Sequence, residues 1–151
     1  MKNRDKTVLN YFKLQIPSNS INEAFSRKCA SAFISSLDPT LMEMADIRTA
    51  VSEAVTNCIV HAYKEMAGTI YISGKYYSDR TVEIKIRDKG CGIPDIKKAM
   101  QPLYTTDTSG ERGGMGFAIM DSFTDKLKVV SAVGKGTSVT LIKNLNDNAE
   151  E

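Results

Sequence analysis

The fold is decided by one stretch of the chain, Thr49-Ala50-Val51-Ser52-Glu53-Ala54-Val55-Thr56-Asn57-Cys58-Ile59-Val60-His61-Ala62-Tyr63. At the helical advance of about 100° per residue, its apolar side chains fall on one arc, which predicts a buried helix face: Val51, Ala54, Val55, Cys58, Ile59 and Ala62. Glu53, Asn57 and His61 follow at every fourth position on the opposite side. The solvated polar face of an ordinary amphipathic helix has the same pattern, so these three residues alone do not indicate a functional site.

Length and charge suggest a single domain. A chain of 151 residues is long enough for a sizeable core, and 20 basic against 18 acidic residues give a net charge of +2. With no basic run longer than two residues, we expect no nucleic-acid partner. No apolar signal region or membrane-length apolar run is present, and Cys29, Cys58 and Cys91 are odd in number and far apart. We therefore expect a cytoplasmic protein without a cysteine-based metal site.

The first half of the chain predicts one strand and two helices. Alternating apolar residues predict a strand over 7–16, ended by Pro17. Ser20 and Glu23 have the spacing of a capping box for a helix reaching about Leu37. Asp38-Pro39 is expected to open the second helix, which ends near Tyr63. The expected buried side of the first helix comprises Ile21, Ala24, Phe25, Cys29, Ala32, Phe33 and Leu37.

The second half predicts two β-hairpins. These cover residues 68–87 and 126–142, the second turning at 134–136, with a short helix at 95–100 and another at 115–123 between them. Paired strands and two long helices predict an α+β fold, a two-layer sandwich whose mostly antiparallel sheet has helices on one face. We expect one domain over residues 1–143 and a polar, acidic tail over 144–151.

Three glycine-marked segments follow the long helix. Asp88 ends a predicted strand and precedes Gly90 and Gly92, so its carboxylate could accept a hydrogen bond from the amino group of adenine. Taken alone, this segment is more typical of a tight turn with an ordinary acidic residue. Residues 110–117 place four glycines and Arg112 before a predicted helix, a pattern that favours phosphate binding. Thr137 follows the glycines of the last hairpin turn, where its hydroxyl could reach a phosphate or water.

In this order the segments resemble the GHKL (Bergerat) ATP-binding fold. Glu53 to Asn57 is similar to its Glu-x-x-x-Asn box, and Asp88-x-Gly90-x-Gly92 to its adenine box. Gly114-Met115-Gly116 is similar to the phosphate box, and Gly136-Thr137 to the last glycine box. Four matches in order make a specific signal.

From about Leu9 to Ile142 the chain also resembles the anti-sigma-F factors of spore-forming bacteria. The segments that carry this are 37–40, 51–61, 92–96, 101–103, 105–106 and 114–117. The resemblance implies a homodimeric serine protein kinase that holds a sporulation sigma factor and phosphorylates an anti-anti-sigma protein. It further implies that ATP or ADP and Mg²⁺ are bound.

The resemblance also implies residue roles. Glu53 is then the general base, Asn57 the Mg²⁺ ligand and Asp88 the adenine acceptor, with Gly90 and Gly92 shaping the pocket and Thr137 supporting it. Arg27 is expected to contact protein partners, although an ordinary surface charge looks the same. The lid and phosphate contacts are assigned to Thr105, Thr106, Arg112, Gly114, Met115 and Gly116.

Some positions depart from the family pattern, and alternatives stay open. The polar lid segment 107–110, Gly113 and Ala62 differ from the usual residues, which bears on lid ordering and nucleotide affinity. One alternative is a nucleotide-dependent module that sequesters a sigma factor with little kinase activity. Another is the anti-sigma kinase of a stress-response sigma factor. A histidine-kinase catalytic domain fits less well, because no phosphoacceptor helix with a histidine precedes it.

Overall fold

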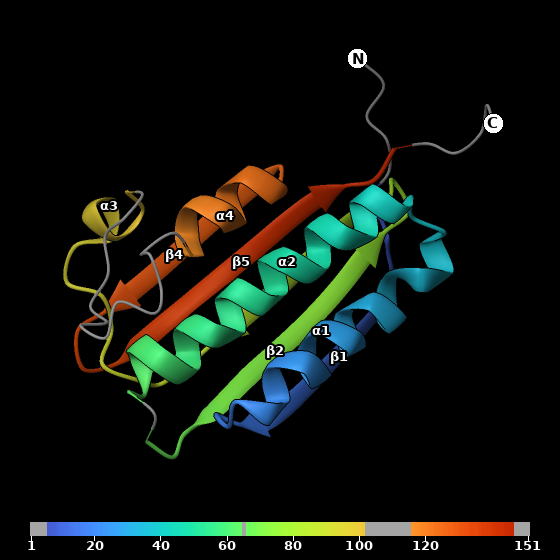
Figure 1. The fold of residues 1–151 in the computed structure, drawn as a ribbon. Coiled ribbons are helices and arrows are strands. Elements are labelled where there is room, and N and C mark those ends of the chain that lie inside the picture. Colours follow the sequence, from blue (N-terminus) through green and yellow to red (C-terminus); the bar gives the residue numbers. More distant parts are fainter. Residues whose placement is uncertain (1–5, 65, 102–115, 147–151) are drawn as a thin grey trace.

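A five-stranded sheet and a layer of helices make up the part of the protein that the structure describes (Figure 1). The computed structural model describes residues 6–64, 66–101 and 116–146. The strands are β1 (Val8–Pro17), β2 (Thr69–Tyr77), β3 (Thr81–Arg87), β4 (Lys126–Ala132) and β5 (Gly136–Asn144). The helices are α1 (Ile21–Ile34), α2 (Leu41–Asn57), α3 (Ile96–Ala99) and α4 (Gly116–Phe123). The predicted α+β sandwich and both hairpins are confirmed.

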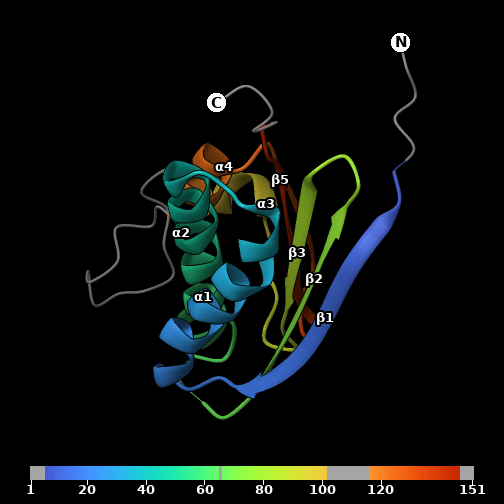
Figure 2. The ribbon, with the colours of Figure 1, turned by 90° about the vertical axis from the view of Figure 1, so that its right-hand side faces the viewer.

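The sheet has the order β1-β2-β3-β5-β4, and all its neighbouring strands are antiparallel. Alternation places the apolar side chains of each strand on one face, as Ile72, Ile86 and Val139 show by lying side by side and buried. Helices α1, α2 and α4 cover that face, and the other face of the sheet stays open (Figure 2). The sequence predicted this one-sided covering.

Helix α2 lies between α1 and α4 and supplies much of the core (Figure 1). Val51, Ala54 and Val55 are at most 1% exposed, and Cys58 and Ile59 are also buried. The predicted arc is thus confirmed, with Ala62 half-buried at its end.

The start of α2 differs from the prediction. Thr40 is the N-cap: its Oγ1 accepts from the backbone N–H of Glu43 at 3.1 Å, while Glu43 Oε1 accepts from the Thr40 N–H at 2.9 Å. This reciprocal pair is a capping box. Asp38 instead ends the 3-10 turn Ser35–Leu37 in the left-handed conformation (φ 51°), so Asp38-Pro39 does not open the helix.

The predictions for α1 were wrong in two respects. The Ser20 side chain makes no capping hydrogen bond, and Asn19 Oδ1 accepts from the Ile21 N–H instead. The fully buried residues are Ser26, Ala30 and Ile34. Of the predicted set, Phe33 and Leu37 are partly buried against the core, whereas Ile21 and Phe25 are exposed. Small side chains let α1 approach its neighbours closely, so hydrophobicity alone selected a rotated face.

Helix α2 continues beyond Asn57 as the π-helical turn Cys58–Ala62, which is closed by a bond from the Tyr63 N–H to the Cys58 carbonyl at 3.0 Å. The helical segment therefore ends near Tyr63, as predicted. Within the three described ranges, no helix is both long enough and apolar enough to cross a bilayer.

Candidate functional site

One end of the candidate site lies where α2 faces the start of α4. Glu53 and Asn57 are half-buried and one turn apart on α2. A Cβ built on Gly116 would lie 3.0 Å from Asn57 Oδ1 and 3.3 Å from Glu53 Oε2, so both side chains converge on the first residue of α4. The backbone N–H groups at a helix N-terminus favour anions. This end therefore combines a carboxylate, an amide oxygen and an anion-attracting backbone.

The other end is built around Asp88, which is 5% exposed at the end of β3. Its Oδ1 accepts from the N–H groups of Gly90 at 2.9 Å and Thr137 at 3.1 Å, and the Cys58 thiol also hydrogen-bonds to the carboxylate. Burial raises the pKa of Asp88 above its usual value, against the lowering effect of these donors. The fold thus holds a buried acceptor in a fixed orientation.

Two glycines let the loop after β3 pack against its neighbours. A Cβ on Gly90 would lie 2.4 Å from the Ala62 carbonyl oxygen, which already accepts from the Cys91 N–H at 3.0 Å. Gly92 has a φ of +77°, and a Cβ there would lie 2.2 Å from the Ala132 carbonyl oxygen. The predicted adenine box therefore joins the end of α2 to the β4–β5 turn.

Residues that the sequence did not single out complete this end. Ser131 Oγ accepts from the Ile93 N–H at 2.8 Å and shares a 2.8 Å hydrogen bond with Thr137 Oγ1. The Tyr63 hydroxyl accepts from the Lys89 N–H at 2.7 Å and donates to the Thr69 carbonyl at 2.6 Å. The sequence pattern indicated no role for Ser131 and placed Tyr63 only at the end of the long helix, so the packing alone reveals what they bind.

The structure brings together Glu53, Asn57 and Gly116 at one end, and Asp88, Gly90, Gly92 and Thr137 at the other. The predicted contacts at Thr105, Thr106, Arg112, Gly114 and Met115 lie outside the described residues. Arg27 lies on α1, where it pairs with Glu23 at 3.5 Å.

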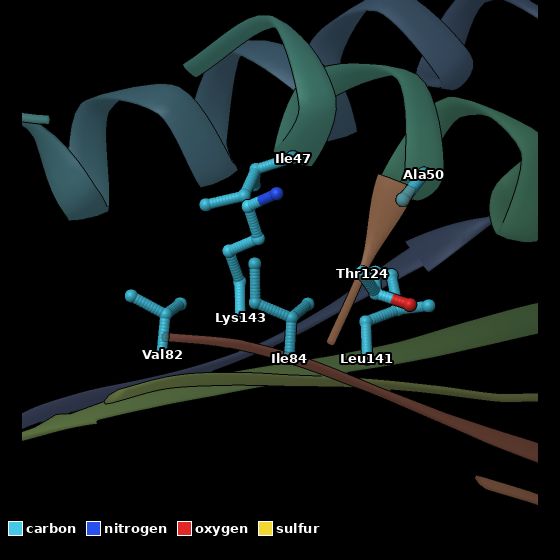
Figure 3. Close-up of a pocket in the computed structure, with 7 residues that line it drawn as sticks. All are labelled: Ile47, Ala50, Val82, Ile84, Thr124, Leu141 and Lys143. Atoms are coloured by element: carbon cyan, nitrogen blue, oxygen red, sulfur yellow. The ribbon is translucent and has the colours of Figure 1, made fainter. Parts of the chain in front are cut away.

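A small cavity between α2 and the sheet lies apart from these residues (Figure 3). Its lining is mostly aliphatic, and its one cation, Lys143, is bound to Asp46 Oδ2 at 2.9 Å. Neither Glu53, Asn57 nor Asp88 lines it. We therefore assign the candidate site to the two ends described above.

The donor set at Asn57 and Glu53 suits a hard cation such as Mg²⁺, which prefers oxygen ligands. No cluster of three or more histidine, cysteine or acidic side chains that could hold a metal occurs in the described part of the chain. The site at Asn57 and Glu53 fits a Mg²⁺ ion that would be held by the Asn57 amide oxygen and would take its other ligands from phosphates and water.

Comparison with known proteins defines the class. The sequence profile of the histidine kinase-like ATPase domain matches residues 20–143. The RsbU and RsbW domains of a Mycobacterium tuberculosis protein superpose with a TM-score of 0.65 and 17% identity, over 90% of this chain and 32% of that one. The catalytic domain of the histidine kinase ThkA superposes with a TM-score of 0.55 and 15% sequence identity. The match covers 91% of this chain and 97% of that one. At such identities these structures support the fold alone.

Sequence relatives narrow the class. The anti-sigma F factor of Caldanaerobacter subterraneus is 50% identical over 92% of this chain and 96% of its own. The anti-sigma F factor of Priestia megaterium is 46% identical over 92% of this chain and 95% of its own. The anti-sigma F factor of Clostridium acetobutylicum is 46% identical over 89% of this chain and 93% of its own. The chain therefore belongs to the histidine kinase-like ATPase family and, within it, to the anti-sigma F factors.

Proposed function

We propose that the protein is an ATP-dependent serine protein kinase and anti-sigma factor. It binds and inhibits a sigma-F-type sporulation sigma factor and phosphorylates the anti-anti-sigma antagonist on serine. The observation that carries the enzymatic part is the two-ended site: a buried, fixed acceptor at Asp88, and Glu53 with Asn57 beside the start of α4. Relatives of up to 50% identity named anti-sigma F factor support the regulatory part.

At the base end, Asp88 selects adenine. Its carboxylate accepts from the exocyclic amino group of adenine, whereas guanine presents a carbonyl oxygen at that position. Two acceptors facing each other repel, and leaving either unpaired in a buried site costs free energy. Gly92 packs closely against the Ala132 carbonyl, and the Thr137 N–H donates to Asp88 Oδ1. These contacts fix the orientation of the Asp88 carboxylate.

At the phosphate end, the backbone N–H groups of α4 face the anionic chain of ATP, and Asn57 is the residue that would hold Mg²⁺ through its amide oxygen. When bound, Mg²⁺ neutralises charge on the phosphate oxygens. Asn57 lies one turn from Glu53, so the helix holds the base beside the phosphates.

Glu53 acts on the attacking group. Its carboxylate accepts the proton of the substrate serine hydroxyl while the serine oxygen bonds to the γ-phosphorus. The bond from that phosphorus to the β–γ bridging oxygen breaks, and ADP leaves with the electron pair. The products are a phosphoserine and ADP.

Partner binding is assigned to α1. Arg27 pairs with Glu23, whose Oε1 in turn accepts from Ser52 Oγ on α2, next to Glu53. The Arg27 Nε is buried with no hydrogen-bond partner among the described residues, so the guanidinium has donor capacity left. On the same helix, Ile21 and Phe25 expose apolar surface that a homodimer or a protein partner would cover.

The three cysteines are unpaired, as expected of a protein that works in the cytoplasm. The proposed function requires this location, because a sigma factor acts on transcription.

The test is phosphoryl transfer. The full chain is incubated with γ-labelled ATP, Mg²⁺ and the candidate anti-anti-sigma protein, and label is sought on serine. A labelled serine is expected, together with a stable complex between the protein and the sigma factor in the presence of nucleotide. ATP binding and sigma binding without any label would instead identify a sequestering module. Label on histidine would contradict the proposal.

A further inference from the structure

The helices leave one face of the sheet open (Figure 2), and the side chains that the strand register places on this face are mostly basic or uncharged. Strand pairing places Lys13, Ser73, Lys85, Thr140 and Lys128 in one row across all five strands. The row on one side contains Tyr11, Lys75, Glu83, Ile142 and Lys126, and the row on the other side contains Gln15, Tyr71, Arg87, Ser138 and Val130. Six of these side chains are cationic and one is acidic, a net charge of +5 against +2 for the whole chain.

The positive charge of this face is poorly compensated. Its one acid, Glu83, lies 3.3 Å from Lys75 Nζ and accepts from the Tyr77 hydroxyl at 3.0 Å. Lys13, Lys85 and Lys128 are exposed, and no carboxylate pairs with them within the described ranges. Such a field attracts polyanions.

Aromatic side chains lie among the cations. The ring of Tyr11 is 69% exposed beside the central row. Tyr71 lies under the Arg87 guanidinium at 4.6 Å and Lys89 Nζ at 5.1 Å. Exposed aromatic rings and guanidinium planes are the surfaces on which unpaired bases stack, and an open antiparallel sheet is one of the scaffolds that presents them.

The composition favours a nucleic acid over an acidic protein. Lysine is depleted in protein–protein interfaces, yet five of the six cations here are lysines. The rows contain only two aliphatic side chains, Ile142 and Val130, so there is no apolar centre for a protein interface. Cations two residues apart on a strand, such as Lys126 and Lys128, lie about 6.6 Å apart along it and repeat across the sheet. A flexible chain of phosphates can follow such an array.

We propose that the open face of the sheet binds single-stranded nucleic acid, with phosphates on the central lysine row and a base stacked on Tyr11. The proposal goes beyond the kinase and anti-sigma function and does not depend on it, because α2, which carries Glu53 and Asn57, lies on the opposite face of the sheet (Figure 2). Little sequence preference is expected, since lysine–phosphate contacts carry no base information.

The test is fluorescence anisotropy with a labelled, mixed-sequence DNA strand of about 20 nucleotides, longer than the binding site of a typical sheet module. The full chain is titrated at several salt concentrations in the presence of saturating ATP and Mg²⁺. The triple variant Lys13→Gln, Lys85→Gln, Lys128→Gln is compared with Lys28→Gln, Lys64→Gln, Lys97→Gln, which removes the same charge from exposed lysines off this face. ATP binding reports whether each variant is folded.

The central triple should weaken binding at least tenfold and reduce the logarithmic salt slope by about 2, since each lost phosphate contact removes about 0.7. The control triple should change affinity less than threefold. Tyr11→Ala should weaken binding about fivefold or more without changing the salt slope, because stacking releases no counterions.

The proposal would be overturned by no binding at low salt, by equal losses in the two triple variants, by tighter binding of the duplex of the same sequence, or by a labelled poly-glutamate peptide that binds as tightly as the strand. Displacement of the DNA strand by ATP would show that the strand binds in the nucleotide site, and would also overturn the proposal.

Discussion

The two ends of the site are built differently. At the proposed adenine end, Asp88 and Thr137 are 5% and 7% exposed, and their polar atoms are bound to backbone groups, to Ser131 or to the Cys58 thiol. At the phosphate end, Glu53 and Asn57 are half-buried on one helix face. In the proposed function, base recognition would therefore depend on buried contacts among loops, and chemistry on side chains that face the substrate. Changes at the first end should act on affinity, and changes at the second on turnover.

The largest effect is expected for Glu53→Gln. The amide keeps the shape of the side chain but cannot accept the serine proton, so kcat should fall at least about 100-fold. The affinity for ATP should stay within about twofold, as measured by calorimetry. Glu83→Gln, which alters a carboxylate on the open sheet face, is the control and should leave kcat unchanged. Full activity of Glu53→Gln would remove this residue from the mechanism.

Asp88→Asn should act on affinity instead. The amide oxygen can still accept from the Gly90 and Thr137 N–H groups, but the charged acceptor for adenine is lost. A hydrogen bond to a charged group contributes about 1.5–3 kcal/mol, so ATP should bind about 10- to 100-fold more weakly. The preference for ATP over GTP should fall in parallel, while kcat at saturating ATP stays near that of the wild type. Unchanged discrimination between the two nucleotides would contradict the role of Asp88.

Asn57→Ala should separate metal-dependent from metal-independent binding. We expect affinity for ATP to fall about tenfold in the presence of Mg²⁺ and to match the wild type in EDTA, because only the metal ligand is lost. Calorimetric titrations with and without Mg²⁺ measure this directly. An equal loss in both conditions would show that Asn57 contacts the nucleotide itself.

The smallest effect concerns the pH dependence of stability. Burial raises the pKa of Asp88 above its usual 3.8, so this group favours folding most at lower pH, and that contribution is lost as the pH rises through the raised value. The free energy of unfolding of the wild type should therefore fall relative to Asp88→Asn across that window and run parallel to it above. Urea unfolding of both proteins between about pH 3 and 7 measures the difference. A rise over the same window would show that the hydrogen-bond donors outweigh burial.

The sequence predicted the elements of this site better than their ends. Hydrophobic periodicity located the helix of Glu53 and both hairpins, because one buried face dominates each. Capping was less predictable, since Ser20 and Thr40 have the same box spacing and tertiary contacts decide which one forms. The buried face of α1 was only partly predicted, because the small residues Ser26 and Ala30 are buried while Phe25 is 49% exposed.

Two features could not be read from sequence order at all. Ser131 and Tyr63 bond to segments far along the chain, so only the fold identifies their partners. The basic face of the sheet does not show in the sequence for two other reasons. Side chains alternate between the two faces of a strand, so other residues separate the lysines along the chain. The net charge of the chain also combines these lysines with acidic residues elsewhere. The expectation of no nucleic-acid partner was based on that net charge and on the lack of a basic run longer than two residues.

The most direct test of the site is a crystal structure of the protein with a non-hydrolysable ATP analogue and Mg²⁺. We expect the adenine amino group within hydrogen-bonding distance of the Asp88 carboxylate, and the terminal phosphate between Asn57, Glu53 and the start of α4. A nucleotide bound in the small cavity beneath α2, on the open face of the sheet, or with its base away from Asp88 would contradict this expectation.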